Sequence, residues 1–254
     1  MSTERTAIIT GAGSGIGKAT ALRFARDGYH VVLNGRQVAP LESVAAEIGL
    51  GRSIVMPGDV SKKTDAQSVI DAAMKAFGRI DVLVNNAGIV NPGTPDMLSD
   101  EDFESMLAVN VGGLRHMSLA ALPALRESRG NIVNVSSVSG MRGDWAMYGY
   151  NASKGAVTLL TQGMALDLGK EGVRVNAVAP TTTNTPLADG LKQIPAAMDA
   201  LNRRIPMGRL VEPEEVASVI AFLVGPDAAF VNGVILPVDG GLSASNGQPN
   251  FLDS

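Results

Sequence analysis

The sequence predicts an α/β fold in which one parallel sheet of seven strands is doubly wound, with helices on both faces. Along the 254 residues, seven short runs rich in Val and Ile alternate with longer segments of helical character. Most of these runs are apolar at nearly every position, so both faces of the sheet should be buried. A glycine-rich turn follows the first run directly, as expected where the first strand of such a sheet leads into its first helix.

The apolar runs are the expected strands, and the gaps between them are long enough for one helix each. The strands are predicted at residues 6–9, 30–33, 53–56, 81–84, 131–135, 174–178 and 234–238. No linker or repeat divides the chain, so residues 1–254 are predicted to form one domain. The stretch 181–207 departs from the alternation, and we expect it to form a lid over the substrate cleft.

Composition excludes several classes of function. The chain has no cysteine, which rules out disulfides, thiolate metal sites and cysteine nucleophiles, and we expect no metal site. The net charge is −4 and the basic residues are scattered, so a nucleic-acid surface is not expected. No apolar run reaches the roughly 18 residues of a membrane span. We therefore expect a cytoplasmic protein without a membrane partner.

Residues 10–17 read TGAGSGIG and connect the first predicted strand to a helical run at 18–26. Glycine lets the backbone turn sharply and approach a ligand, and the free amides at a helix start favour a pyrophosphate. A mononucleotide P-loop is excluded because Lys18 is followed by Ala19 rather than by Ser or Thr. The residues expected to bind a dinucleotide here are Gly11, Ser14, Gly15, Ile16 and Gly17.

The end of the second predicted strand indicates which dinucleotide is bound. Such sites usually place an acid about 20 residues after the glycine turn to hold ribose hydroxyls, whereas a nearby arginine accommodates a 2′-phosphate. Asn34 and Arg36 occupy this region, and the acid is missing. We expect both residues to contact the adenosine end of the cofactor. NADP(H) is favoured, and NAD(H) is the alternative.

Tyr150 and Lys154 are four residues apart in a segment predicted to be helical at 150–170. Four residues advance a helix by about 400°, so the phenol and the ammonium project from the same face one turn apart. Bringing a phenol from its usual pKa of about 10 to neutrality requires about 4 kcal/mol, and a cation about 4 Å away supplies a term of that size. We therefore expect Lys154 to lower the pKa of Tyr150 and make it a base. Tyr148 lies off the lysine's face.

These features occur together with further motifs in a fixed order. The motifs are TGAGSGIG at 10–17, Asp59 and Val60, NNAG at 85–88, Asn110, NVSS at 134–137, YNASK at 150–154, NAVAP at 176–180 and PVDGG at 237–241. In their order and spacing the chain resembles the short-chain dehydrogenase/reductase family over essentially its whole length. The resemblance implies a Rossmann fold, an NAD(P)-dependent oxidoreductase and a homotetramer, in which helices at 99–127 and 150–170 pack on partner copies.

The resemblance also implies roles for single residues. The interval to Tyr150 selects Ser137 rather than Ser136 as the serine that hydrogen-bonds the substrate oxygen. Tyr150 would move the proton as general acid or base, Lys154 would also hold the nicotinamide ribose, and Asn110 would hold a water that passes the proton toward solvent. Further cofactor contacts are implied for Asp59, Val60, Asn86, Ala87, Gly88, Pro180, Thr183 and Thr185.

The predicted substrate cleft is mainly apolar. Its expected side chains, besides Ser137, are Met141, Trp145 and Leu187, with Val90, Met147 and Leu191 nearby. None of them would clamp a carboxylate or phosphate, so a small secondary alcohol or vicinal diol and the corresponding ketone fit best. SGMRGDW at 139–145 and RIPMGRLVEPEEVA at 204–217 resemble the branch of the family that contains acetoin reductases and meso-2,3-butanediol dehydrogenases.

The same residues bear on three other functions. A serine hydrolase is disfavoured because the two histidines, His30 and His116, are expected to be structural and no G-x-S-x-G elbow is present. A 3-oxoacyl-[acyl-carrier-protein] reductase stays open, and a basic docking patch beside the cleft would favour it. A non-catalytic nucleotide-sensing protein would keep the glycine turn but need not keep Ser137, Tyr150 and Lys154 together.

Overall fold

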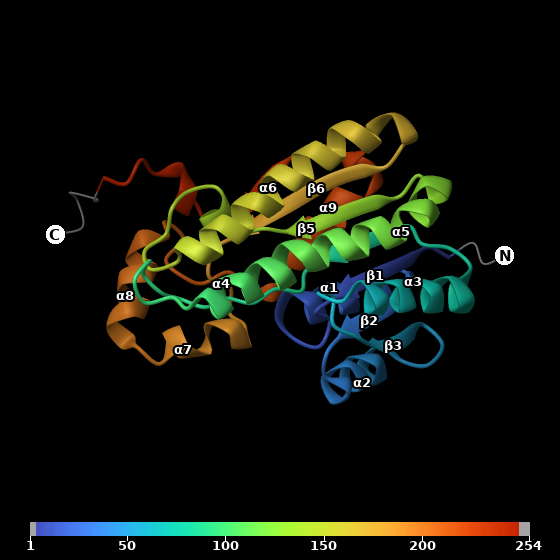
Figure 1. The fold of residues 1–254 in the computed structure, drawn as a ribbon, viewed down its shortest axis with the longest axis horizontal. Coiled ribbons are helices and arrows are strands. Elements are labelled where there is room, and N and C mark those ends of the chain that lie inside the picture. The colour runs from blue at the N-terminus through green and yellow to red at the C-terminus, as the bar shows by residue number, and fades with distance from the viewer. Residues whose placement is uncertain (1–3, 249–254) are drawn as a thin grey trace.

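The computed structural model describes residues 4–248 and confirms the predicted fold class. In this range the sheet has seven strands, all parallel, in the order β3-β2-β1-β4-β5-β6-β7 (Figure 1). The strands are β1 (Thr6–Thr10), β2 (His30–Gly35), β3 (Ser53–Pro57), β4 (Val82–Asn85), β5 (Asn131–Val135), β6 (Arg174–Pro180) and β7 (Ile235–Val238). Residues 1–3 and 249–254 of the predicted domain lie outside the described residues.

Helices cover both faces of the sheet. They are α1 (Gly15–Arg26), α2 (Val38–Ile48), α3 (Lys63–Phe77), α4 (Asp100–Leu107), α5 (Leu114–Ser128), α6 (Tyr148–Leu168), α7 (Asp189–Lys192), α8 (Pro195–Arg204) and α9 (Pro213–Val224). Helices α1, α2 and α9 pack on one face, and α3, α5 and α6 pack on the other. In Figure 1, α4, α7 and α8 lie together at the end of the molecule away from the N-terminus.

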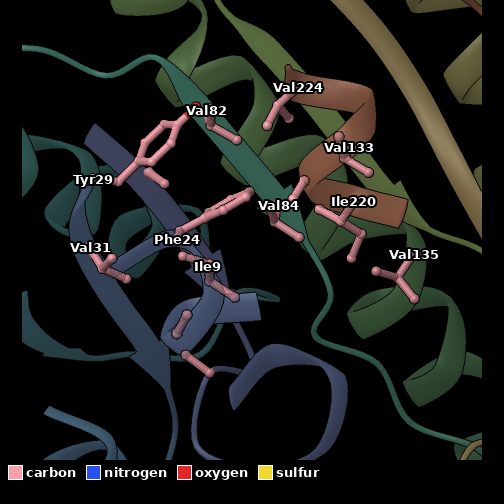
Figure 2. Close-up of a cluster of buried hydrophobic side chains, with 14 of the residues drawn as sticks. Ile9, Phe24, Tyr29, Val31, Val82, Val84, Val133, Val135, Ile220 and Val224 are labelled. Atoms are coloured by element: carbon pink, nitrogen blue, oxygen red, sulfur yellow. The ribbon is translucent and has the colours of Figure 1, made fainter. Parts of the chain in front are cut away.

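Neighbouring residues of the central strands enter different apolar layers. In β1, Ile9 belongs to the layer under α1 and α9, whereas the adjacent Ile8 belongs to the layer under α3 and α5. Figure 2 shows the first layer, where Phe24 of α1 lies between Ile9 and Val84. Each fully buried Ile or Phe side chain stabilises the fold by roughly 1.5–3 kcal/mol. These layers therefore hold β1 and β4 rigidly, and the candidate site is built at their ends.

The strand order reverses beside β1. One edge of β1 pairs with β2 and the other pairs with β4, so the chain winds away from β1 in opposite directions in the two halves of the sheet. Doubly wound sheets bind their ligands in the crevice at the carboxyl ends of two such strands. The glycine turn follows β1 and the NNAG segment follows β4, so this reversal brings the two predicted cofactor segments together.

The helical segments differ from the prediction in three places. The expected helix at 99–127 divides into α4, a π-helical segment (Ala108–Gly113) and α5. The bulge brings Gly113 so close to Val60 that an added Cβ would lie 2.5 Å from Val60 Cγ2. The β6–β7 connection holds α7, α8 and α9 rather than one helix. Helix α1 begins at Gly15 rather than at Lys18, because the last glycines of the turn are already helical.

Candidate active site

The glycine turn lies against the end of β4. Gly11 has a φ of +64°, and a Cβ added there would lie 2.8 Å from Asn86 Nδ2. A Cβ added at Gly17 would collide with the Gly11 carbonyl oxygen. The Asn86 side chain donates to the carbonyl oxygens of Thr10 at 2.9 Å and Gly11 at 3.3 Å. Two glycines are thus required by close packing, and Asn86 braces the turn.

The start of α1 is suited to an anion. Ser14 precedes the helix with an extended backbone, and within residues 4–248 its side chain makes no capping hydrogen bond and the first turn carries no acid. The first amides of the helix therefore have no side-chain acceptor, and the positive end of the helix dipole is not neutralised. These features fit the pyrophosphate of NAD(P), which the glycines would allow to approach the backbone.

Asn34 and Arg36 lie at the end of β2 but in different surroundings. The Asn34 side chain is buried, and its Nδ2 donates to the carbonyl oxygens of Met56 at 3.0 Å and Gly58 at 3.3 Å. Its Oδ1 is buried without a hydrogen-bond partner among the described residues. Arg36 is exposed. The asparagine therefore joins β2 to the end of β3, and the arginine is left free to meet a ligand.

Asp59 and Val60 follow β3 beside Arg36. Asp59 Oδ1 accepts hydrogen bonds from Ser61 N at 3.0 Å and Ser61 Oγ at 2.7 Å. Burial raises the pKa of Asp59, but these bonds and the charges of Arg36 and Lys62 outweigh burial and lower that pKa. An ionised carboxylate therefore stands next to the predicted adenosine position. Val60 is buried against the π-helical segment.

The segment after β4 connects the cofactor side to the catalytic side. The amides of Asn86 and Ala87 both donate to Thr10 Oγ1 at 2.9 Å. A Cβ added at Gly88 would lie 3.2 Å from Asn110 Oδ1 and 3.5 Å from Lys154 Nζ. Gly88 therefore lies directly beside two of the predicted catalytic residues.

Ser137, Tyr150 and Lys154 meet at the carboxyl end of β5. The Ser137 hydroxyl lies within hydrogen-bonding reach of the Tyr150 phenol, whose pKa it lowers. Lys154 is 5% exposed, its Nζ donates to the Val135 carbonyl oxygen at 2.8 Å, and it lies 5.7 Å from the centroid of the Tyr150 ring. The neighbouring Ser136 instead bonds to the Lys154 carbonyl oxygen at 3.2 Å and to Thr158 Oγ1 at 3.0 Å.

The electrostatics of this cluster differ from the prediction. Burial raises the pKa of Tyr150 to about 12, which the Ser137 hydrogen bond opposes and the Asp144 charge reinforces. Burial lowers the pKa of Lys154 to about 8. The expectation that Lys154 by itself brings the phenol to neutrality is therefore wrong, because desolvation of the phenolate is the larger effect. The phenol of the chain alone is protonated at neutral pH.

Asn110 lies in the π-helical segment, and its side chain is fully engaged. Its Oδ1 accepts from Ile89 N at 2.8 Å, and its Nδ2 donates to the Ile89 carbonyl oxygen at 2.9 Å and to Ser153 Oγ at 3.0 Å. Ser153 Oγ in turn donates to the Tyr150 carbonyl oxygen at 2.8 Å. The amide therefore ties the segment after β4 to the helix that carries Tyr150 and Lys154.

The segment after β6 crosses the glycine turn. Thr183 is buried, and its Oγ1 donates to the Thr181 carbonyl oxygen at 3.0 Å. A Cβ added at Gly15 would lie 2.8 Å from Thr185 Cγ2. Pro180, the last residue of β6, is buried beneath them. Thr185 therefore lies against the glycine turn, and Pro180 and Thr183 precede it in the same segment.

The predicted substrate contacts are exposed to different degrees. Met141 is partly buried, as are Val90, Met147 and Leu191. Trp145 is 95% exposed and Leu187 is 60% exposed. The prediction placed both side chains in an apolar cleft, whereas the structure directs them mainly into solvent. Trp145 belongs to an irregular loop, in which the next residue, Ala146, has a φ of +55°, so the indole does not follow the face of a helix or strand.

Three residues of the cluster were not predicted. Thr10 accepts the two amides after β4, Ser139 donates its amide to Ser137 Oγ at 3.1 Å, and Asp144 accepts from Ser139 Oγ at 3.1 Å. Ser and Thr are too common for such contacts to be recognised from sequence. Asp144 stands in a loop without periodicity, so nothing in the sequence marks it.

The two histidines make contacts away from these serines. His30 stacks on Phe77 with ring centroids 4.4 Å apart, and His116 Nδ1 lies 3.2 Å from the Val60 carbonyl oxygen. The described part of the chain holds no group of three or more His, Cys, Asp or Glu side chains arranged to bind a metal. Within the same range, no helix is both long enough and apolar enough to cross a membrane.

Comparisons with known proteins agree with this geometry. Residues 11–243 match the family described as enoyl-(acyl carrier protein) reductase. The meso-2,3-butanediol dehydrogenase of Serratia marcescens is 43% identical over 98% of both chains. The crystal structure of a 3-ketoacyl-(acyl-carrier-protein) reductase from Brucella melitensis complexed with NADH is 38% identical, with a TM-score of 0.89 over 95% of this chain and 100% of that one.

A levodione reductase structure is 34% identical, with a TM-score of 0.91 over 96% of this chain and 100% of that one. Similarity of this extent covers every motif from the glycine turn to the end of β7. It also covers the adjacent serine and tyrosine beside the buried lysine. The chain therefore belongs to the short-chain dehydrogenase/reductase family of NAD(P)-dependent oxidoreductases that act on CH–OH groups.

Proposed function

We propose that this enzyme interconverts a small, largely apolar secondary alcohol or vicinal diol and its ketone, and that it prefers NADP(H) to NAD(H). The observation that carries the proposal is the proximity of the Ser137 and Tyr150 hydroxyls beside the buried ammonium of Lys154. This arrangement offers a proton donor and a hydrogen-bond donor to one substrate oxygen, which is what reduction of a carbonyl requires.

Each residue of the proposed catalytic set has one task. Ser137 Oγ donates a hydrogen bond to the substrate oxygen and fixes it beside Tyr150. Tyr150 gives its proton to that oxygen in reduction and removes it in oxidation. Lys154 favours the phenolate electrostatically and holds the nicotinamide ribose. A bound NAD(P) would supply or accept the hydride.

Asn110 is proposed to stand beside the path along which the proton passes from the active site to solvent. Because its side-chain amide is bonded to Ile89 and Ser153, a water in this path would be held chiefly by backbone atoms of the π-helical segment. The amide would fix the position of that segment relative to Lys154. Asn110 then acts by shaping the path rather than by handing on the proton itself.

The raised pKa of Tyr150 bears on the direction of the reaction. With a pKa of about 12 in the chain alone, the phenol is a proton donor at neutral pH and is ready for ketone reduction. Oxidation requires the phenolate, so it should be favoured at alkaline pH. The positive charge of an oxidised nicotinamide ring would assist Lys154 in that direction.

The preference for NADP(H) rests on the end of β2. Gly35 offers no carboxylate to the ribose hydroxyls, and the exposed guanidinium of Arg36 lies next in the chain. An arginine at this place accommodates a 2′-phosphate, whereas an acid would repel it. The remaining proposed contacts with the cofactor are Gly11, Ser14, Gly15, Ile16, Gly17, Asn34, Asp59, Val60, Asn86, Ala87, Gly88, Pro180, Thr183 and Thr185.

The proposed substrate class rests on the partly buried apolar side chains near Ser137, such as Met141, and on similarity to the butanediol and levodione enzymes. We also propose that residues 181–207 act as a lid. Asn184 anchors this segment, because its Nδ2 donates to Glu212 Oε2 at 3.1 Å and its Oδ1 accepts from Lys192 Nζ at 3.0 Å. The exposed Trp145 and Leu187 would meet the substrate when the lid closes.

The direct test is a substrate panel with either NADPH or NADH, in which cofactor oxidation is followed by absorbance. The panel contains small vicinal diketones and hydroxyketones, cyclic diketones and 3-oxoacyl thioesters. We expect the highest kcat/KM with NADPH and a small vicinal diketone or hydroxyketone. Highest activity with a 3-oxoacyl thioester would replace the proposal by the 3-oxoacyl-[acyl-carrier-protein] reductase function, which the Brucella melitensis relative favours. Turnover of none of the ketones would contradict the proposed substrate class.

We further propose a homotetramer. Leu159 and Leu166 on α6 are large apolar side chains exposed by 69% and 83%, and Phe222 on α9 and Phe230 beyond it are exposed as well. These residues lie on two separate elements, as two distinct contacts in a tetramer would require. Light scattering coupled to size-exclusion chromatography should give four times the chain mass. A Leu166→Glu variant should reduce that mass, whereas an unchanged mass would exclude the α6 contact.

A further inference from the structure

Asp144 has no role in the proposed mechanism, yet its carboxylate is bonded into the loop that carries Ser137. Asp144 Oδ2 accepts a hydrogen bond from Ser139 Oγ at 3.1 Å, and Ser139 N donates to Ser137 Oγ at 3.1 Å. Ser139 is buried. The carboxylate is therefore connected, through one buried serine, to the hydroxyl that lies beside the Tyr150 phenol.

The loop around Asp144 is fixed at both ends. Asp144 Oδ1 accepts from Trp145 N at 2.9 Å, and the Asp144 carbonyl oxygen accepts from Asn151 Nδ2 at 3.2 Å. The Ala146 carbonyl oxygen accepts from Gly93 N at 2.7 Å. Asn151 follows Tyr150 in α6, so the loop is tied to the helix at the level of the phenol. These bonds restrict where the carboxylate can move.

The Ser137 hydroxyl is oriented by the same contacts. Ser139 N donates to Ser137 Oγ and so occupies one acceptor position of that oxygen. The hydroxyl proton of Ser137 therefore points away from Ser139 N. The Tyr150 phenol lies within hydrogen-bonding reach of the same hydroxyl. A hydroxyl held in this way presents its proton where the substrate oxygen would lie.

Few charges stand near the phenol. The elements that pack against α6 at this level are α4, the π-helical segment and the 138–147 loop, and α6 itself carries Lys154. Asp102 of α4 is held by Asn91 at 2.9 Å and by Ser99 at 2.8 Å. The charged side chains on these elements are Asp100, Glu101, Asp102, Glu104, Arg142, Asp144, Lys154 and, at the far end of α6, Asp167. Among the described residues, Asp144 is the one whose charge raises the pKa of Tyr150.

We propose that Asp144 is a positioning residue for the reaction: its carboxylate fixes Ser139, and thereby the Ser137 hydroxyl that acts on the substrate oxygen. The negative charge of the same carboxylate also favours the protonated phenol of Tyr150. The inference rests on the proposed function, in which Ser137 and Tyr150 act on the substrate oxygen. Asp144 and Lys154 then act on the phenol with opposite signs. Reduction uses the protonated phenol and oxidation uses the phenolate. The charge of Asp144 therefore keeps the enzyme active in reduction up to a higher pH, and it raises the pH at which oxidation begins.

The charge and the positioning can be separated by two variants. Asp144→Asn keeps the shape of the side chain and removes the charge. The value of kcat/KM for alcohol oxidation rises with pH, and the midpoint of this rise should move to lower pH by about half to one unit. The shift is modest because a partly solvated charge is screened. Ser139→Ala keeps the charge of Asp144 and the backbone bond to Ser137, but it removes the side-chain hydrogen bond through which Asp144 holds Ser139 in place. It should lower kcat by about tenfold at every pH without moving the midpoint.

Two further variants serve as controls. Asp144→Glu restores the charge, so its midpoint should return to within about 0.2 units of the unmodified enzyme. Asp227→Asn changes the net charge by the same amount in an exposed turn after α9, and its profile should coincide with that of the unmodified enzyme. Thermal unfolding of each variant shows that the proteins compared are folded.

Tyr150→Phe is measured alongside to distinguish the two levels of the proposal. Normal turnover by Tyr150→Phe would contradict the proposed function and the inference with it. Loss of turnover in Tyr150→Phe, together with an unmoved midpoint in Asp144→Asn, would overturn the inference about Asp144 alone. A downward shift in Asp144→Asn that Asp227→Asn does not share supports the inference.

Discussion

Lys154 Nζ donates a hydrogen bond to the Val135 carbonyl oxygen at 2.8 Å, so the ammonium is fixed by the end of β5 as well as by its own helix. The glycine at position 140 packs against the same lysine, since a Cβ added there would lie 2.5 Å from the Lys154 carbonyl oxygen. Movement of the lysine toward solvent would therefore break its bond to β5. This rigidity keeps a charge beside Tyr150 in a place where burial disfavours any charge.

The first prediction concerns Lys154 and the pH dependence of stability. Burial lowers the folded-state pKa to about 8 from its ordinary value of 10.5. Between these values the unfolded chain holds a proton that the folded chain has lost, so this group's contribution to stability rises with pH in that window. The contribution is present above the unfolded pKa and is lost as pH falls through the folded pKa.

Lys154→Met removes this titration. The quantity compared is the difference in free energy of unfolding between the unmodified enzyme and Lys154→Met. This difference should increase in favour of the unmodified enzyme by up to about 3 kcal/mol between pH 8 and pH 10.5. Urea denaturation at a series of pH values measures this difference, and the titration of other groups cancels in it. A difference that stays constant or falls over this range would show that the lysine is not desolvated.

The second prediction concerns Gly35 and the choice of cofactor. A Cβ added at Gly35 would lie 3.4 Å from Leu41 Cδ2, so a small side chain can be accommodated. Gly35→Asp introduces a carboxylate that would bind ribose hydroxyls and repel a 2′-phosphate. The ratio of the Kd for NADPH to the Kd for NADH should rise by about 100-fold or more, an effect of about 2.7 kcal/mol.

Gly35→Asn is the matched control, because it has the same size without the charge. It should change the ratio by less than about tenfold. Both dissociation constants can be followed through the single tryptophan of the chain or by calorimetry. An unchanged ratio in Gly35→Asp would mean that the 2′-position of the cofactor lies elsewhere.

The third prediction concerns Asn110. Asn110→Ala leaves both the amide and the carbonyl oxygen of Ile89 without the side-chain partner they have now. A buried polar group deprived of its partner costs about 1–3 kcal/mol, so the free energy of unfolding should fall by about 2–4 kcal/mol. Denaturant unfolding measures this loss. Stability within about 0.5 kcal/mol of the unmodified enzyme would mean that water replaces the amide at Ile89.

The fourth prediction concerns Gly17. Gly17→Ala places a methyl group against the Gly11 carbonyl oxygen and within 2.6 Å of Asn86 Nδ2, so the turn must shift. The Kd for NADPH should rise by at least about tenfold, and the free energy of unfolding should fall by about 1–3 kcal/mol. Ser14→Ala is the contrasting variant. Its free energy of unfolding should change by less than about 0.5 kcal/mol, because Ser14 provides no side-chain cap. Equal losses in both variants would contradict the packing argument.

The sequence predicts the parts of the molecule that depend on local spacing. The strands are continuous apolar runs, and the glycine turn and the Tyr150–Lys154 pair are short segments whose geometry follows from turn and helix parameters. The structure confirms the seven-stranded parallel sheet and places Ser137, Tyr150 and Lys154 together. The choice of Ser137 over its neighbour came from family spacing rather than from chemistry.

The remaining features depend on contacts between distant segments. The bulge at Asn110 exists because its side chain bonds to Ile89, 21 residues away, and no local pattern shows that pairing. The raised pKa of Tyr150 follows from burial, and burial depends on packing that no local spacing of residues shows. Trp145 is apolar and was predicted in the cleft, but the conformation of its loop exposes it.

The central claim is that the Tyr150 phenol transfers the proton, and one substitution tests it most directly. Tyr150→Phe removes the hydroxyl and keeps the ring, so cofactor binding should stay within about threefold of the unmodified enzyme. The value of kcat for the best ketone with NADPH should fall by at least about 100-fold, the range expected for loss of a general acid. A Tyr150→Phe enzyme whose kcat lies within about threefold of the unmodified value would contradict the account.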